Sequence, residues 1–175
     1  MPLLRVQGFV NTRDVEDGTD VLADRATARD WLTEAGLIDG GARLSPSALE
    51  VAREVREGIR SLIEAGGADV APDEPRLEPL RRLAATHRAR LMVGPAGTVD
   101  LENSHRGELG DGLFELLLII RRAQEDGSWT RLKVCANPEC QWAFFDRSRN
   151  QQGSWCNMAV CGNRLKNREL RARRR

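Results

Sequence analysis

The sequence predicts an α+β protein with a mainly helical N-terminal domain, which contains a short hairpin, followed by a small treble-clef-like four-cysteine module. Two observations predict this division. Residues 1–130 carry 16 basic and 23 acidic side chains, whereas residues 131–175 carry 11 basic and 3 acidic ones, so a net charge of −7 is followed by +8. All four cysteines also lie in the second segment. We therefore expect an acidic domain over residues 1–127 and a basic module over residues 128–175.

Apolar residues at helical spacing predict most of the acidic domain. One helix is expected over Arg25–Ala35 and another around Leu77–Ala89, after a Pro-rich link. The segment Leu113–Ala123 is apolar nearly all round its first half, which is typical of a central core helix. Between these helices, Arg90–Val93 and Thr98–Leu101 flank a Gly-Pro turn and predict a short hairpin.

The clearest helix signal begins in the sequence Ser45-Pro46-Ser47. Either Ser45 is the N-cap and Pro46 takes the first helical position, or Ser47 is the N-cap and Glu50 completes a capping box. Charged pairs such as Arg56-Glu57 are expected on the solvated face of this helix, where ion pairs form at i,i+3 and i,i+4 spacing. Its predicted buried face is formed by Val51, Val55, Ile59, Leu62 and Ile63.

The acidic domain shows no catalytic constellation, and we do not expect an enzyme. Its two histidines, His87 and His105, have no cysteine or second histidine at ligand spacing, and its glycines form no phosphate-binding fingerprint. We expect His87 to be a partly exposed helix residue. His105 lies in a polar loop that could contact a small-molecule effector, and a pocket around His105 or Asp100 is where any catalytic site would lie.

The cysteines form a C-x4-C-x15-C-x4-C pattern made of Cys135, Cys140, Cys156 and Cys161. Zinc takes four thiolates in a tetrahedron, and two short cysteine pairs joined by a hairpin-sized spacer can supply them. The alternatives are two disulfides or four unrelated thiols. Disulfides need an oxidising compartment, and the first ten residues show no export signal. We therefore expect one structural zinc ion, since four cysteine ligands leave no position for an activated water.

Local signals place the two cysteine pairs on a hairpin and on a helix. Residues 131–134 and 142–145 predict two strands, and Asn137-Pro138 favours a tight turn within the first pair. A helix is expected from Asn157, a good N-cap residue, so that the last two ligands lie at its start. The aromatic residues of the module are expected in its small core rather than stacked on bases; they are Trp142, Phe144, Phe145 and Trp155.

An arginine stripe is predicted on the C-terminal helix. Arg164, Arg168, Arg171 and Arg175 fall within an arc of about 60° on a helical wheel. Arginine pairs bidentately with phosphate and with guanine edges, so the stripe is a candidate surface for duplex DNA; a solvated basic tail is the alternative. Near the helix start, Asn163 could contact a base or could bond its own backbone and shape the turn. The candidate nucleic-acid contacts are Lys133, Arg147, Arg149, Asn163, Arg164, Lys166, Arg168, Arg171 and Arg175.

The basic module closely resembles the CGNR zinc-finger family, which is named for a motif found here as Cys161-Gly162-Asn163-Arg164. The resemblance extends to Trp155-Cys156 with Met158, to residues 146–150 and to the first cysteine pair. It implies a DNA-binding zinc finger that follows an N-terminal ABATE domain, a domain assigned to stress-induced transcription regulation. Residues 9–12 and 29–32 resemble that domain.

We therefore expect a cytoplasmic bacterial transcription regulator that binds duplex DNA through its zinc module. Its acidic domain would form a homodimer or bind an unknown small-molecule effector. One alternative is an RNA- or ribosome-associated binder, and another is a protein-interaction module whose zinc unit docks on an acidic partner or on the chain's own acidic domain. The longest wholly apolar run, Leu116–Ile120, is far shorter than the roughly 20 residues of a membrane span, so no membrane association is expected.

Overall fold

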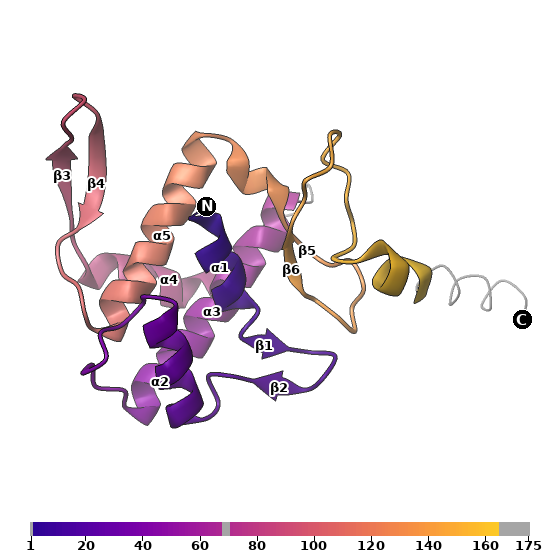
Figure 1. Cartoon of the computed structure of the whole chain (residues 1–175), viewed down its shortest axis with the longest axis horizontal. Coiled ribbons are helices and arrows are strands. Elements are labelled where there is room, and N and C mark those ends of the chain that lie inside the picture. The colour runs from indigo at the N-terminus through magenta and orange to yellow at the C-terminus, as the bar shows by residue number, and fades with distance from the viewer. Residues whose placement is uncertain (1, 68–70, 165–175) are drawn as a thin grey trace, which may run out of the picture.

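The structure is a computed structural model of the 175-residue chain and describes residues 2–67 and 71–164. In these residues, five α-helices are interspersed with three two-stranded antiparallel sheets (Figure 1). The helices are α1 (Leu3–Val10), α2 (Arg25–Glu34), α3 (Pro46–Gly67), α4 (Glu74–Thr86) and α5 (Leu109–Glu125). The paired strands are β1 (Arg13–Asp14) with β2 (Thr19–Asp20), β3 (Ala89–Val93) with β4 (Val99–Asn103), and β5 (Leu132–Val134) with β6 (Ala143–Phe145). Within the same residues, no helix has the length and hydropathy needed to cross a bilayer.

Helices α3 and α5 supply much of the buried core. Ser45 is the N-cap of α3, because its Oγ accepts a hydrogen bond from the Ala48 amide at 3.0 Å, which decides between the two predicted caps. Most of the predicted apolar face of α3 is buried, but Val51 is exposed. The central position predicted for the helix over Leu113–Ala123 is confirmed, since α5 buries residues along its whole length.

The boundaries of α4 differ from the prediction by about one turn. The helix begins at Glu74 rather than near Leu77, because Pro75 in its first turn has no amide hydrogen that needs a partner. It ends at Thr86, and Ala89 is already the first residue of β3. The predicted hairpin is confirmed and extends to five residue pairs, from Ala89 opposite Asn103 to Val93 opposite Val99.

The expectation that Arg56-Glu57 lies on a solvated face is wrong for the arginine. Arg56 is 2% exposed and Arg60 is 1% exposed. Arg56 donates two hydrogen bonds to the Asp20 carboxylate, at 2.6 and 2.8 Å. Arg60 donates to the carbonyls of Val10 and Gln141. Buried guanidinium groups persist here because carboxylates and carbonyls from distant parts of the chain satisfy their donors.

The β5–β6 hairpin packs directly on the helices. Leu132 and Ala143 are fully buried and belong to the same hydrophobic cluster as α1, α3 and α5. The side chain of Asn11, at the end of α1, pairs with the backbone of Ala143 in both directions, with two hydrogen bonds of 2.8 Å. The cysteine-bearing hairpin is therefore held against the end of α1 both by apolar burial and by hydrogen bonds.

Candidate metal centre and nucleic-acid interface

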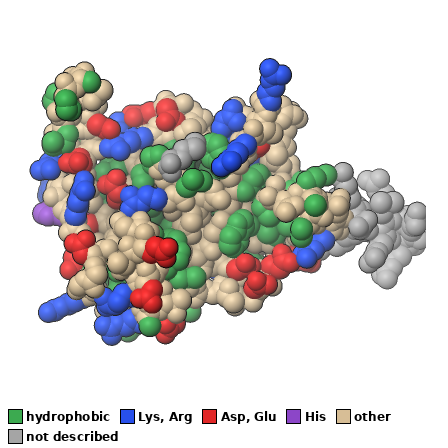
Figure 2. Space-filling view, in the orientation of Figure 1, with side chains coloured by type: hydrophobic (Ala, Val, Ile, Leu, Met, Phe, Trp, Pro, Cys, Tyr) green, Lys and Arg blue, Asp and Glu red, His purple; other side chains and the backbone are tan. Residues whose placement is uncertain are grey.

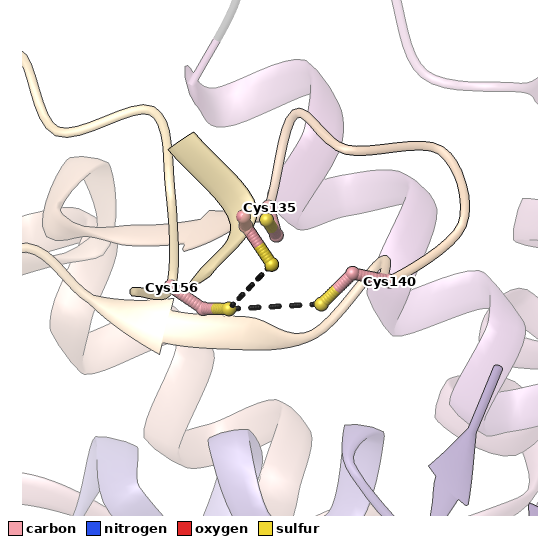
Figure 3. A group of neighbouring side chains, drawn as sticks. Cys135, Cys140 and Cys156 are labelled. Carbon is pink, nitrogen blue, oxygen red and sulfur yellow. Dashed lines mark hydrogen bonds between the residues drawn. The ribbon is translucent and has the colours of Figure 1, made fainter. Parts of the chain in front are cut away.

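The four cysteines converge on one point. Their sulfur atoms all lie within 4.8 Å of one another. The Cys156 Sγ lies 3.6 Å from the Cys140 Sγ and 3.7 Å from the Cys161 Sγ, and Figure 3 shows the thiols of Cys140 and Cys156 pointing toward each other. A zinc tetrahedron with Zn–S bonds of about 2.3 Å has sulfur–sulfur edges of about 3.8 Å. The sulfur spacing therefore fits a zinc ion.

Neither alternative for the cysteines fits this arrangement. All four are free thiols, and a separation of 3.6 Å is far longer than the roughly 2.05 Å of a disulfide bond. Four unrelated core thiols would not gather around one point. Trp142 and Trp155 pack on the cysteine cluster, as predicted for the module core, whereas Phe145 packs on the main hydrophobic cluster instead.

The first cysteine pair is shaped by Asn137. Its backbone carbonyl accepts from the Cys140 amide at 2.9 Å, and its side-chain oxygen accepts from the Glu139 amide at 3.3 Å, which confirms the predicted tight turn. The Asn137 side chain is 1% exposed, and its Nδ2 has no hydrogen-bond partner among the described residues. A buried N–H donor in the loop between two ligands suits a site that holds the negative charge of thiolates.

The second cysteine pair lies around a one-turn helix, Met158–Gly162, which is capped by Asn157 as predicted; Cys156 precedes the helix and Cys161 lies within it. The Asn157 side-chain oxygen accepts from the amides of Ala159 and Val160, at 2.9 and 3.3 Å. Asn163 donates to the Ala159 carbonyl at 3.1 Å, so it bonds its own helical turn. At Gly162, a β-carbon would lie 2.5 Å from the Met158 sulfur, so a larger residue there would require the Met158 side chain to move.

Asp146 organises the loop that leads from β6 to Cys156. It is 4% exposed and accepts hydrogen bonds from the Lys133 ammonium at 3.0 Å and from the amides of Ser148 and Gly153 at 2.9 and 2.8 Å. Burial alone would raise the pKa of Asp146, but these donors outweigh it and hold the pKa below its ordinary value. In the sequence, Asp146 is marked only as part of the 146–150 segment, although an Asp two residues before a Ser is a common signal for a side-chain-stabilised turn.

The predicted nucleic-acid contacts occupy different environments. The Lys133 ammonium donates hydrogen bonds to Asp146 and to the carbonyls of Gln151 and Gly153, so it stabilises the loop that follows β6. Arg147 and Arg149 are exposed on that loop and form no ion pair with any residue that the structure describes. The remaining predicted contacts, Lys166, Arg168, Arg171 and Arg175, lie outside the described residues.

Arg164, in the CGNR motif, is exposed and forms an ion pair with Glu16, which lies between β1 and β2. Glu16 and the residues around it form an acidic turn with the sequence Asp14-Val15-Glu16-Asp17. Figure 2 shows acidic side chains gathered beside the start of the C-terminal segment. The first arginine of the predicted stripe thus already contacts an anionic group of the acidic domain.

The protonation of the thiols predicts a pH dependence of zinc binding. Burial raises the pKa of Cys140 to about 11, and burial together with the neighbouring thiols raises that of Cys156. Both groups are therefore protonated at neutral pH without metal, and binding releases at least two protons. We expect zinc affinity to rise about a hundredfold per pH unit near neutrality. Competition with a chromophoric chelator, corrected for the chelator's own protonation, measures this slope; a slope near zero would contradict it.

The comparisons with known families agree with this geometry. Residues 131–174 match a family model described as "CGNR zinc finger", and residues 6–125 match the ABATE model, described as "Putative stress-induced transcription regulator". No curated protein matches the chain. The four convergent thiols and the zinc-finger match together identify one structural zinc ion, held by the four cysteines. The chain belongs to the ABATE family and carries a CGNR zinc finger after its ABATE domain.

Proposed function

We propose that this protein is a transcription regulator that binds duplex DNA through the CGNR zinc module. The proposal rests on the position of the CGNR turn, the turn formed by residues 161–164. The thiols of Cys156 and Cys161 hold this turn at the metal centre, and Arg164 follows it as an exposed cation. Among the described residues, the turn lies at the end of the molecule opposite the β3–β4 hairpin (Figure 1). DNA could approach there without displacing a helix of the acidic domain.

The charges of the module support an electrostatic mode of binding. Residues 131–175 have a net charge of +8, and the exposed arginines Arg147, Arg149 and Arg164 belong to it. Arginine neutralises phosphates and releases the counterions condensed on DNA, which favours association at low salt. A zinc ion with four cysteine ligands keeps no open coordination position, so we propose a binding role rather than catalysis.

The proposal is tested by fluorescence anisotropy of the zinc-loaded chain with random-sequence duplex DNA and with single-stranded RNA, over a series of salt concentrations. With roughly four to six phosphate contacts, the logarithm of the duplex affinity should fall against log salt with a slope of about −4 to −5. The variants Arg147→Ala/Arg149→Ala and Arg168→Ala/Arg171→Ala should each make this slope shallower by about 2.

The matched control is Arg81→Ala/Arg90→Ala, which removes the same charge from exposed positions of the acidic domain and should leave the slope unchanged. If the chain binds neither polymer at low salt, the module is a protein-interaction unit and the proposal fails. If it prefers single-stranded RNA, the alternative of an RNA binder replaces it.

Removing the carboxylate that pairs with Arg164 should tighten DNA binding. A phosphate must compete with Glu16 for this guanidinium, and exposed ion pairs of this kind are weak enough to be displaced. We expect Glu16→Gln to raise duplex affinity roughly two- to fivefold at low salt. The control Glu125→Gln removes another exposed carboxylate, which pairs with Arg121 on α5. Equal gains in both variants would show a general effect of net charge and contradict a specific competition.

A further inference from the structure

The β3–β4 hairpin carries an aliphatic face that continues beyond the body of the protein. The register places Leu91 opposite Leu101 and Val93 opposite Val99, and such directly opposed residues share one face of a two-stranded sheet. At the base of this face, Leu101 packs against the main hydrophobic cluster. At its outer end, Leu91, Val93 and Val99 are 71%, 72% and 65% exposed. They are the most exposed large hydrophobic side chains of the described residues.

The charged residues of the hairpin all lie on the opposite face and are paired within the chain. Arg90 bonds Glu102 across the strands at 3.1 Å. Asp100 bonds Arg122 of α5 at 3.0 Å, and Arg122 also donates to the Leu101 carbonyl at 2.6 Å. These contacts fix the hairpin to the body along β4. They leave the aliphatic face without a single charge and without a covering element among the described residues.

We propose that the outer half of this hairpin is a self-association surface, and that its occupant is the same hairpin of a second copy of the chain. An uncharged row of leucine and valine pairs offers nothing to an acidic or basic partner. It is complementary to itself, as a two-fold symmetric contact requires. The paired charges lie on the opposite face of the hairpin and would stay in contact with solvent in such a dimer.

The area of the surface indicates how tightly the dimer forms, and its position on the molecule indicates which parts stay accessible. Two such hairpins packed face to face bury on the order of 800 Å² in total, less than the roughly 1,200 Å² of a standard stable interface. The dimer is therefore concentration-dependent, with a dissociation constant on the order of 10–100 µM. The hairpin and the zinc module lie at opposite ends of the molecule (Figure 1), so association leaves both zinc modules uncovered.

Sedimentation velocity of the zinc-loaded full chain without DNA tests the inference over a range of concentrations. The key variant is Val93→Thr/Val99→Thr, which keeps the β-branched shape and strand propensity but replaces one methyl group with a hydroxyl at each position. We expect it to dimerise at least roughly tenfold more weakly. The control Met92→Thr changes an exposed residue of the same strand, 41% exposed, on the opposite face, and should change the dissociation constant less than roughly twofold.

Three results would overturn the inference: a wild-type chain that stays monomeric well above 100 µM, a double variant that dimerises as the wild type does, or equal weakening in the control. The substituted positions are exposed, so the melting temperature of both variants should stay near that of the wild type, which separates loss of contact from unfolding. Hydrogen exchange provides a local readout, since protection at residues 91–93 should rise with protein concentration. Because no DNA is present, the result is independent of the proposed function.

Discussion

Replacement of Cys156 by serine is expected to empty the zinc site and unfold the zinc module. The Cys156 sulfur lies 3.6 Å from one partner sulfur and 3.7 Å from another, so its loss removes one of the four vertices of the tetrahedron. Structural zinc contributes roughly 10–16 kcal/mol in zinc-finger peptides, which exceeds the net stability of a module this small. Native mass spectrometry should find one zinc per wild-type chain and less than about 0.1 per variant chain.

The effect of Cys156→Ser should reach the acidic domain. Leu132 and Ala143 of the module are fully buried against the helices, and Asn11 is hydrogen-bonded to the same hairpin. Loss of this cover should destabilise the helical body by about 3 kcal/mol and lower its melting temperature by roughly 6–12 °C.

Two controls make this prediction specific. Met158→Leu, two residues after Cys156, should keep its zinc, because Met158 is half-exposed and contributes no ligand. A strong chelator should lower the melting temperature of the wild type to that of Cys156→Ser and should leave the variant unchanged. A variant that retains one zinc per chain would mean that three thiolates suffice.

The zinc site could be predicted because the residues that shape it lie close together in the sequence. Each cysteine pair spans only six residues, and each pair is shaped by an asparagine, Asn137 or Asn157, whose side chain bonds amides two or three residues away. Such turns depend on neighbouring residues alone, so the sequence indicates them directly. The helix caps are predictable for the same reason, as Ser45 shows.

The burial of arginine could not be predicted in this way. Arg56 and Arg60 occur in a charged stretch typical of a solvated helix face, yet besides the neighbouring Glu57 they bond residues that are 36 to 81 positions distant in sequence. Similarly, Lys133 counts as a positive charge in any sum over the module, but only the fold shows that it bonds the internal Asp146. Strands β1 and β2 are two residues long and leave no periodic pattern.

The β3–β4 hairpin shows the reverse case, in which apolar residues that a sequence pattern would assign to the core are exposed. The alternation of apolar and polar residues from Val99 to Glu102 is typical of a strand with one apolar face. It does not indicate where the body ends, and so cannot distinguish the covered Leu101 from the exposed Val99. Whether a residue of the apolar face is buried or exposed depends on how far the hairpin extends past the helices against which it packs.

Replacement of Arg60 by methionine is expected to cost about 3–5 kcal/mol of folding free energy. Arg60 donates to the carbonyls of Val10 and Gln141 and bonds Glu57, at the junction of α1, α3 and the cysteine loop. Methionine fills most of the same volume, but it leaves the buried carbonyl of Val10 and the partly buried carbonyl of Gln141 without these donors. Urea unfolding should show the loss.

Arg121→Met is the matched control for Arg60→Met, because Arg121 pairs with Glu125 on the exposed side of α5; it should change stability by less than about 0.5 kcal/mol. Gln141 follows the ligand Cys140 directly, so loss of the Arg60 contact should also weaken zinc binding by roughly tenfold or more, as loss of a supporting contact does at other metal sites. A variant that loses stability but keeps the wild-type zinc affinity would show that the module holds its metal independently of the helices. Loss of both stability and zinc affinity would show that the acidic domain helps to shape the metal centre.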